Sequence, residues 1–375
     1  MEIESVQTLR ALLAAGTPMD GMRLQGLDLT EVEEELLAAD PRGAVVLGGR
    51  VGERLEEHLR RGGALVFPAL PQCPVDPYRN RLYTAEELYA GLQDGYEHTL
   101  DARCYAWSRD ATTRHDVLAT MVRAVHDDAV SDALVEVLAG RSVVGVMGGH
   151  ALRRGTPQYA EAAHLARALS RAGHLVLTGG GPGAMEAANL GARLAGADDA
   201  ALQDALDHLG TVPDFAPDVA AWAGAGLDVL ADHPAPHSPA SIGIPTWFYG
   251  HEPPNVFPGL VAKYFSNALR EDVLLVTVTA GIVYLPGAAG TLQELFQAAT
   301  PGYYSPGGGV PLVLLGREHW TRRLPAWDLL GALAAGRPMA ARVHLLDDAS
   351  DTDGVLAALG DAAHPGPPVL TRPRP

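Results

Sequence analysis

Two glycine-rich turns of the sequence have the residue types that bind a phosphate group. Gly179 to Gly183 (GGGPG) and Pro286 to Thr291 (PGAAGT) each follow a short apolar run and precede a run with helical spacing. Glycines let the backbone approach an anion, and the free N–H groups at the start of a following helix point toward it. The sequence therefore predicts an anion site built from both turns.

The second turn also brings a carboxylate within reach of that site. Thr291 supplies a hydroxyl group, and Glu294 follows it near the start of the predicted helix. When a base leaves a ribosyl carbon, a nearby carboxylate stabilises the positive charge that develops on the sugar, and it also orients the attacking water. A glutamate in a first helical turn otherwise compensates the helix dipole. The turn that precedes Glu294 favours the catalytic interpretation.

Neither turn has the pattern of the common nucleotide-binding motifs. Gly179 to Gly183 lacks the GxGxxG spacing of dinucleotide-binding proteins, and the acidic residue that binds their ribose would fall at Asp198-Asp199, inside an inserted stretch rather than at a strand end. Neither turn contains the GK[ST] of a Walker A loop. A dehydrogenase and an ATPase are both disfavoured.

The two motifs together resemble those of a known family. GGGPGxMEAAN (Gly179 to Asn189) and PGxxGTxxE (Pro286 to Glu294) are similar to the paired motifs of the LOG (lonely guy) family, also labelled lysine decarboxylase-like. The resemblance covers about residues 141 to 316, and the longer chain is similar to the long bacterial members. It implies a Rossmann-like phosphoribohydrolase that cleaves the N-glycosidic bond of a nucleoside 5′-monophosphate to free base and ribose 5-phosphate. It also implies no metal, no organic cofactor, and a homodimer or higher homo-oligomer.

The resemblance assigns roles to individual residues. The catalytic glutamate of the family matches Glu294, and its catalytic arginine most nearly matches Arg270, although the His-Glu-Arg-Lys stretch of the short members is absent. Ala288 stands where the family loop usually has a second glycine, and its methyl group narrows or reshapes the phosphate pocket. The predicted catalytic residues are Glu294 and Arg270, and the predicted substrate- and phosphate-binding residues are Gly180, Gly181, Gly183, Glu186, Lys263, Pro286, Gly287, Ala288, Ala289, Gly290 and Thr291.

Three of these residues also have a structural interpretation. Arg270 and Lys263 lie on one face of a predicted helix, where they either bind phosphate or pair with Glu271 and Asp272. Glu186 either lines the ribose pocket or compensates the dipole of the helix that follows the first turn. The sequence leaves both interpretations open.

Two other functions compete with this one. A noncatalytic nucleotide sensor with the same fold has no need of Glu294, so that residue favours the enzyme. A true lysine decarboxylase needs pyridoxal phosphate held as a Schiff base. Lys263 is the only lysine of the chain, and no residues typical of a pyridoxal site accompany it. Decarboxylation is therefore disfavoured.

The alternation of β-branched runs with alanine-rich helical runs predicts an α/β fold, with a Rossmann-like parallel sheet covered by helices on both faces and a smaller N-terminal α/β domain. We expect the N-terminal domain at 1–140, the nucleotide-binding catalytic domain at 141–362 with an inserted lid or subdomain at 196–240, and a flexible tail at 363–375. The predicted strands are 44–47, 64–67, 142–147, 174–178, 241–247, 281–285, 310–315 and 343–346, and the predicted helices are 50–61, 116–138, 157–172, 184–195 and 292–299.

Two runs between these elements are less simple. Val261, Phe265 and Leu269 recur at four-residue spacing and predict an apolar helix over 257–269. Such a helix packs either on its own sheet or on a second copy of the chain. The run 273–280 is compatible with a strand and also with a continuation of that helix.

The composition excludes several other classes of protein. The 45 acidic and 28 basic side chains give a net charge of −17, which disfavours binding to nucleic acid. The two cysteines, Cys73 and Cys104, form no CxxC pattern, so a metal site is not indicated. No apolar run is as long as a membrane span, and the N-terminus has no secretory pattern. We expect a cytoplasmic protein with a nucleoside monophosphate as its ligand and no membrane partner.

Overall fold

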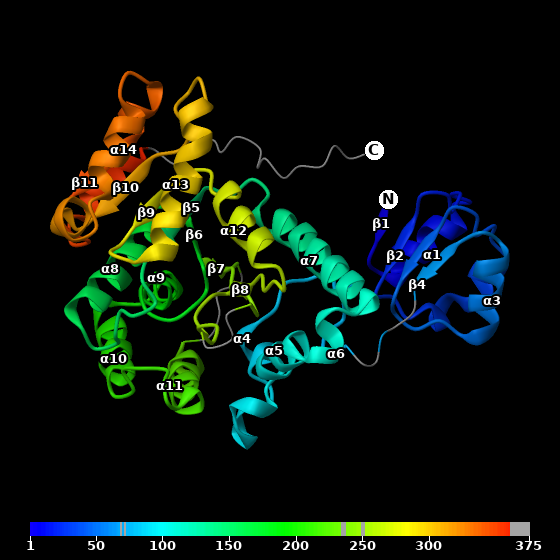
Figure 1. Ribbon diagram of the computed structural model, residues 1–375. Helices are drawn as coiled ribbons and strands as arrows, with labels where there is room; N and C mark the ends of the chain where they lie inside the picture. The colour runs from blue at the N-terminus through cyan, green and yellow to red at the C-terminus, as the bar shows by residue number, and fades with distance from the viewer. Residues whose placement is uncertain (68–69, 71–72, 234–237, 249–251, 361–375) are drawn as a thin grey trace. The chain divides into compact units, whose positions relative to one another are not determined.

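The computed structural model of the chain (Figure 1) describes residues 1–67, 70, 73–233, 238–248 and 252–360. The chain forms two compact units. The first comprises residues 1–82 and 106–133, and the second comprises residues 83–105 and the chain from 134 onward. The predicted tail at 363–375 lies outside the described residues.

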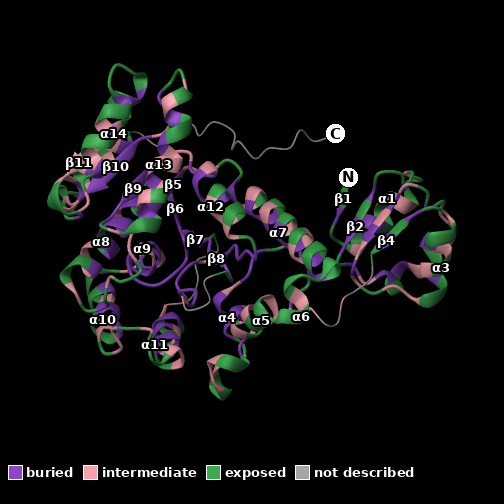
Figure 2. Ribbon diagram, in the orientation of Figure 1, coloured by how far each residue is buried: buried purple, intermediate pink, exposed green. Residues whose placement is uncertain are grey.

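The second unit is built on a parallel sheet whose described strands run in the order β11-β10-β9-β5-β6-β7-β8. β5 is buried along its whole length, and so are its neighbours β6 and β9 (Figure 2). Strands without a polar face are typical of parallel sheets that helices cover on both sides. The strands are β5 (Val143–Met147), β6 (Leu175–Thr178), β7 (Ser241–Gly243), β8 (Leu260–Val261), β9 (Gly281–Tyr284), β10 (Leu312–Leu315) and β11 (Val343–Leu346).

Helices cover both faces of this sheet, which confirms the predicted Rossmann-like fold class. α8, α9 and α15 form one contacting group, and α12, α13 and α14 form another. Right-handed crossovers explain the division, because the chain leaves β5 in one direction and β9 in the other. The bounds are α4 (Ala85–Leu88), α8 (Pro157–Arg171), α9 (Ala184–Arg193), α10 (Asp199–Gly210), α11 (Val219–Asp232), α12 (Asn267–Val276), α13 (Ala289–Tyr304), α14 (Ala326–Ala334) and α15 (Thr352–Leu359), with shorter turns η2 (Leu92–Asp94), η3 (Tyr96–His98), η4 (His319–Arg323) and η5 (Pro338–Arg342). Within the described residues, no helix combines the length and the apolarity that crossing a membrane would require.

The helices α8 and α9 approach each other at backbone distance. A Cβ atom added at Gly191 of α9 would lie 1.8 Å from the carbonyl oxygen of Ala163 in α8. Only glycine allows this approach, so α9 is held closely against its neighbour. The packing of α9 on α8 therefore helps to fix the position of the glycine-rich turn that precedes α9.

The segment 196–240, which we expected to be an inserted lid or subdomain, contains α10 and α11 and clusters with the second unit. Asp198 and Asp218 cap these helices, since each side chain accepts a hydrogen bond from a first-turn N–H group. Capping accounts for part of the acidic composition. Trp222 in α11 is only 1% exposed, so the segment has a buried face. Its action as a lid stays a prediction.

The predicted helix over 257–269 is wrong. Leu260 and Val261 form β8, and α12 begins only at Asn267, with the Ser266 side chain as its cap. The sequence Pro258-Gly259 opposes a helix at this point. Val261 and Phe265 are instead buried within their own unit. The ambiguous run 273–280 continues α12 as far as Val276 and then turns toward β9.

The first unit is a smaller α/β structure with a parallel sheet in the order β1-β2-β3-β4, as predicted for the N-terminal part. The strand, helix, strand succession expected over 44–67 is confirmed by β3, α3 and β4. Its elements are β1 (Glu2–Ile3), α1 (Val6–Ala14), β2 (Arg23–Gln25), η1 (Leu29–Val32), α2 (Glu33–Leu37), β3 (Val45–Leu47), α3 (Glu53–Arg61), β4 (Leu65–Phe67) and α6 (Ala111–Arg114), and two helices, α5 (Leu100–Arg109) and α7 (Val117–Leu138), continue past its limits.

Residues 83–105 cluster with the second unit although they precede residue 140. Tyr83 and Val261 exchange two backbone hydrogen bonds, of 2.9 and 2.8 Å, which attach the start of this segment to β8. The predicted limit at residue 140 does not separate this segment from the larger sheet.

Candidate functional site

Three loops meet at the carboxyl edge of the larger sheet. They follow β5, β6 and β9, and β5 lies between the other two strands. The chain leaves β6 and β9 toward opposite faces, and parallel α/β sheets bind ligands at such a point. The Gly149 N–H donates to the Pro286 carbonyl (3.1 Å), and the Ala184 N–H donates to the Gly149 carbonyl (3.1 Å). The two glycine-rich turns are therefore joined through Gly149.

The two turns differ in exposure. Gly180, Gly181 and Gly183 of the first turn are buried, whereas Pro286 and the stretch 288–290 of the second turn are exposed. Gly183 has a φ of +74°, and a Cβ atom there would lie 2.6 Å from the carbonyl oxygens of two residues in the loop after β5. The first turn is thus a packed scaffold, and the second is open to a ligand.

The open loop ends at a helix start that no side chain caps. α13 begins after Ala288, which makes no side-chain capping hydrogen bond, whereas Thr156, Asp198 and Ser266 cap α8, α10 and α12. The first N–H groups of an α-helix have no partner within the helix. A Cβ atom at Gly287 would lie 2.1 Å from the Thr291 hydroxyl oxygen, so glycine keeps this loop close to the helix. The predicted loop from Pro286 to Thr291 can offer Ala289 and Gly290 amides to an anion.

Glu294 and Arg270, the two predicted catalytic residues, lie beside each other. Arg270 Nη1 of α12 is 3.9 Å from Glu294 Oε1 of α13, and their side chains are 12% and 16% exposed. The two helices are joined nearby, because Gln293 of α13 donates to Glu271 of α12 (2.5 Å). Within α12, Asn267 donates to the same carboxylate (2.8 Å). The pair is therefore held on two packed helices at the open loop.

Burial raises the pKa of Glu294 from 4.5 to about 7. The loss of hydration is the largest cause, and the negative charge of Glu271 raises this pKa further. The positive charge of Arg270 lowers it, but by less than the loss of hydration raises it. A carboxyl group that titrates near neutral pH is suited to acid–base chemistry. The geometry and the pKa of Glu294 both fit the predicted role.

Arg270 also faces the first turn. Its Nη1 atom lies 4.0 Å from where a Cβ atom of Gly179 would stand. Its Nε atom is buried and has no hydrogen-bond partner. Because a buried donor without a partner is unfavourable, this guanidinium is suited to an acceptor that a ligand supplies.

The structure does not bring Lys263 and Glu186 to this pair as charges that are free for a ligand. Lys263 precedes α12, is 1% exposed, and pairs with Asp101 at 2.5 Å. Glu186 pairs with Arg154 at 2.5 Å, and both side chains are 1% exposed. The sequence left ligand-binding and structural roles open for both residues, and these contacts favour structural roles. The acidic partner of Lys263 is Asp101, however, and not Glu271 or Asp272.

Three residues that contact the turns or Glu186 are not among the predicted site residues. Asn255 donates to the Gly181 carbonyl (2.9 Å), and its backbone N–H donates to the Gly180 carbonyl (2.8 Å). His319, after β10, hydrogen-bonds the Gly287 backbone, and burial lowers its pKa. Arg154 holds Glu186. The contacts join sequence-distant residues, so a local pattern does not identify them.

A cavity of about 570 Å³ lies elsewhere in the second unit. Its lining includes His174 and Ala240, which precede β6 and β7, so it opens at the amino edge of the sheet. It is distinct from the Glu294 site. Among the described residues, no cluster of histidine, cysteine, aspartate and glutamate side chains has the arrangement of a metal site.

Comparison with known proteins identifies one segment by family. Residues 141–200 match the model of the SLOG cluster4 family. No curated protein matches the chain. The fold is similar to the molybdenum cofactor binding protein of Rippkaea orientalis (16% identity, TM-score 0.37, covering 59% of this chain and 98% of that one). It is also similar to the Moco carrier protein of Chlamydomonas reinhardtii (19% identity, TM-score 0.34, covering 58% and 97%).

The matched segment contains β5, α8, β6, the GGGPG turn and α9. It includes two adjacent strands of the larger sheet and carries the first of the two motifs. The long bacterial type stays a prediction. The family resemblance inferred from the motifs is confirmed by the match of residues 141–200 to the SLOG cluster4 family model.

Proposed function

We propose that the chain hydrolyses the N-glycosidic bond of a nucleoside 5′-monophosphate and releases the free base and ribose 5-phosphate. The observation that carries this proposal is Glu294, whose pKa is raised to about 7 at a site 3.9 Å from Arg270 and beside an open, uncapped loop. A ligand-binding α/β edge, a cation and a neutral-pH carboxyl group are the parts that this reaction needs.

The proposed reaction uses these groups in sequence. The 5′-phosphate binds the Gly287 to Thr291 loop, and Arg270 adds a charge-assisted contact. Ionised Glu294 stabilises the oxocarbenium charge and orients water. The bond from C1′ to the base nitrogen breaks with its electron pair on nitrogen, the water oxygen bonds to C1′, and one water proton ends on the base. The reaction needs no oxidant and no organic cofactor.

The test is incubation of the purified protein with a panel of purine and pyrimidine nucleoside 5′-monophosphates, followed by chromatography for free base and ribose 5-phosphate. We expect release of both products in equal amounts from at least one nucleotide. Binding without release from any of them would favour the noncatalytic nucleotide sensor.

Nucleosides without the phosphate should be poor substrates. The amides of the loop from Gly287 to Thr291 have no anion to bind in such a substrate, and each charge-assisted contact contributes about 1.5–3 kcal/mol. We therefore expect kcat/KM for a nucleoside to be lower by at least about tenfold than for its monophosphate. Equal values, measured with the preferred base, would contradict the assignment of this loop to phosphate.

We also propose that the protein is a cytoplasmic homo-oligomer in which α12 lies near the interface. The family resemblance supports it, and Leu269, next to Arg270, is an apolar side chain with 36% exposure. Dilution below the dissociation constant should then lower specific activity together with molar mass. A fully active monomer in light scattering at the assay concentration would refute this proposal.

A further inference from the structure

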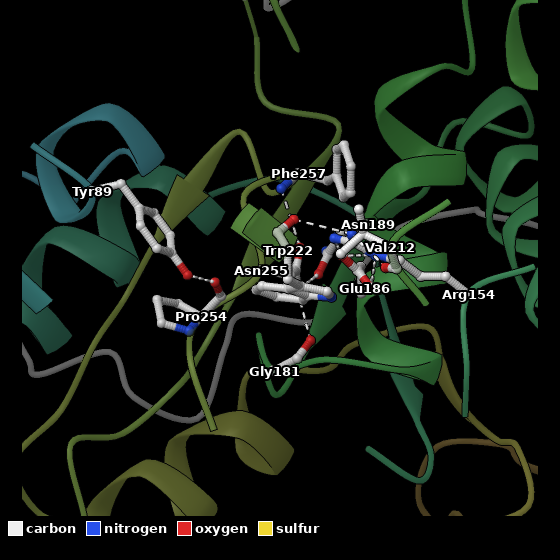
Figure 3. A network of polar contacts seen from close by, with 10 residues as sticks. All are labelled: Tyr89, Arg154, Gly181, Glu186, Asn189, Val212, Trp222, Pro254, Asn255 and Phe257. Atoms are coloured by element: carbon white, nitrogen blue, oxygen red, sulfur yellow. Dashed lines mark hydrogen bonds and ion pairs between the residues drawn. The ribbon is translucent and has the colours of Figure 1, made fainter. Parts of the chain in front are cut away.

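A buried ion pair joins three segments of the second unit behind the first glycine-rich turn (Figure 3). Arg154 lies in the loop after β5, and Glu186 lies in the first turn of α9. Arg154 Nε donates to both oxygens of Glu186 (3.2 and 3.1 Å), and Nη2 donates to Oε1 (2.5 Å). Nη1 donates to the carbonyls of Val212 (3.3 Å) and Trp222 (3.0 Å). One side chain therefore connects the β5 loop, α9 and the 196–240 segment.

The contacts of Arg154 require an arginine. The guanidinium carbon lies 4.5 Å from the centroid of the Trp222 ring, so one face of the group is stacked while its edge binds the carboxylate. A lysine ammonium has neither the plane nor the forked donors that reach a carboxylate and two carbonyls together. The neighbouring Arg153 differs, because it pairs with Asp214 at the surface, where these side chains are 59% and 43% exposed.

The helix α9, which contains Glu186 in its first turn, also holds the turn through Asn189. Asn189, one helical turn further along α9, accepts hydrogen bonds from Thr178 (2.8 Å) and from Asn255 (3.0 Å). Asn255 in turn donates to the Gly181 carbonyl (2.9 Å), and the Thr178 hydroxyl accepts from the Gly180 N–H (3.0 Å). The GGGPG turn therefore depends on where the first two turns of α9 lie.

Stability alone does not explain a pair of this kind. Removing two charges from water is costly, and apolar residues of similar volume often replace a buried ion pair without loss of stability. An ion pair that also binds two backbone carbonyls and an aromatic face does fix relative positions, because each of its bonds has a direction. The pair lies between the glycine-rich turn and the inserted helices α10 and α11.

We propose that Arg154 and Glu186 are positioning residues, which fix the GGGPG turn and the Arg270 side of the ligand site against the 196–240 segment. The inference rests on the proposed function only for the identity of the ligand. Through the contacts of Arg154, the 196–240 segment is a structural part of the site. Displacement of α11 therefore changes the position of the GGGPG turn.

Amide hydrogen exchange of the ligand-free protein tests the coupling directly. The variant Arg154→Met/Glu186→Met removes both charges and leaves none unpaired. We expect the amides of residues 183–187 and of α11 to exchange at least about tenfold faster in this variant, with protection in β5 and β9 unchanged, because loss of a local contact lowers local protection before global stability. Arg153→Met is the matched control, and it should leave exchange at 183–187 unchanged.

A folded double variant with native exchange at 183–187 would overturn the proposal. Should the double variant not fold, Trp222→Leu decides, because it keeps both charges and removes only the stacked ring. Faster exchange at both α11 and 183–187 in that variant supports the coupling. Faster exchange at α11 alone refutes it.

Kinetics with the preferred nucleoside monophosphate separates positioning from a general loss of structure. The variant Arg154→Met/Glu186→Met leaves the residues Glu294 and Arg270 unsubstituted and displaces the turn that Arg270 faces. We therefore expect it to raise KM by about tenfold or more with a smaller change in kcat, as misplaced binding groups do. The single variant Arg154→Lys should also have a KM above the native value. A native KM in the double variant would contradict the positioning role of the pair. If the unaltered protein cleaves no nucleotide, the proposed function fails, while the exchange result still decides this inference.

Discussion

Replacement of Glu294 by glutamine should reduce base release by roughly 10²–10⁴-fold, the usual range for loss of an acid–base group. The amide has nearly the shape of the carboxyl group, but it can neither stabilise the developing positive charge as an anion nor draw a proton from water. Nucleotide affinity should change little, because the loop from Gly287 to Thr291 is untouched. Steady-state release of free base, with binding measured by calorimetry, gives both quantities.

The same variant should be more stable than the native protein at alkaline pH. Because the pKa of Glu294 rises from 4.5 to about 7 on folding, the folded chain retains a proton that the unfolded chain has lost between these values, and ionised Glu294 opposes folding above pH 7. Glutamine removes this cost, which is on the order of 3 kcal/mol. We expect Glu294→Gln to melt above the native protein at pH 8 and the difference to shrink as the pH falls toward 5.

An exposed glutamate at the same edge of the sheet supplies the control for both measurements. Glu318 pairs with Arg323 at the surface, with 66% and 72% of these side chains exposed. Glu318→Gln should change neither turnover nor the pH dependence of melting, because a surface pair of this kind contributes little. Near-native turnover in Glu294→Gln would show that this carboxyl group is not the catalytic one.

The parts of the site that the sequence predicts are those set by local pattern. A strand, a glycine-rich turn and a helix are contiguous, so Gly287, Thr291 and Glu294 can be placed from spacing alone. The fold class follows from the same alternation. Arg270 lies on a different helix from Glu294, and only the family resemblance predicted that the two residues share a site.

Contacts between distant segments could not be predicted in this way. Arg153 and Arg154 are adjacent and chemically identical, yet one is exposed and the other is buried on Glu186, because the difference is made by Trp222 of the inserted segment. Lys263 was expected on a helix that Pro258-Gly259 prevents. The burial of the first turn likewise depends on Asn255, which follows β7 rather than β6.

The pH dependence of kcat/KM should identify Glu294 as the titrating group, because its two charged neighbours shift its pKa in opposite directions. Ionised Glu294 is the active form in the proposed reaction, so activity should rise with pH through a pKa near 7. Arg270 lowers this pKa, so Arg270→Gln should move the acidic limb to higher pH. Glu271 raises it, so Glu271→Gln should move the limb to lower pH.

Arg270→Gln should also lower the plateau of kcat/KM by about 10- to 200-fold, since a charge-assisted contact of about 1.5–3 kcal/mol to the ligand is lost. Arg270→Lys keeps the charge and should leave the limb near its native position while losing part of the plateau, because an ammonium lacks the forked donors. Profiles measured from pH 5 to 9 separate the limb from the plateau. Shifts of the same sign in Arg270→Gln and Glu271→Gln would show that the titrating group is not Glu294, since these two charges act on it in opposite directions.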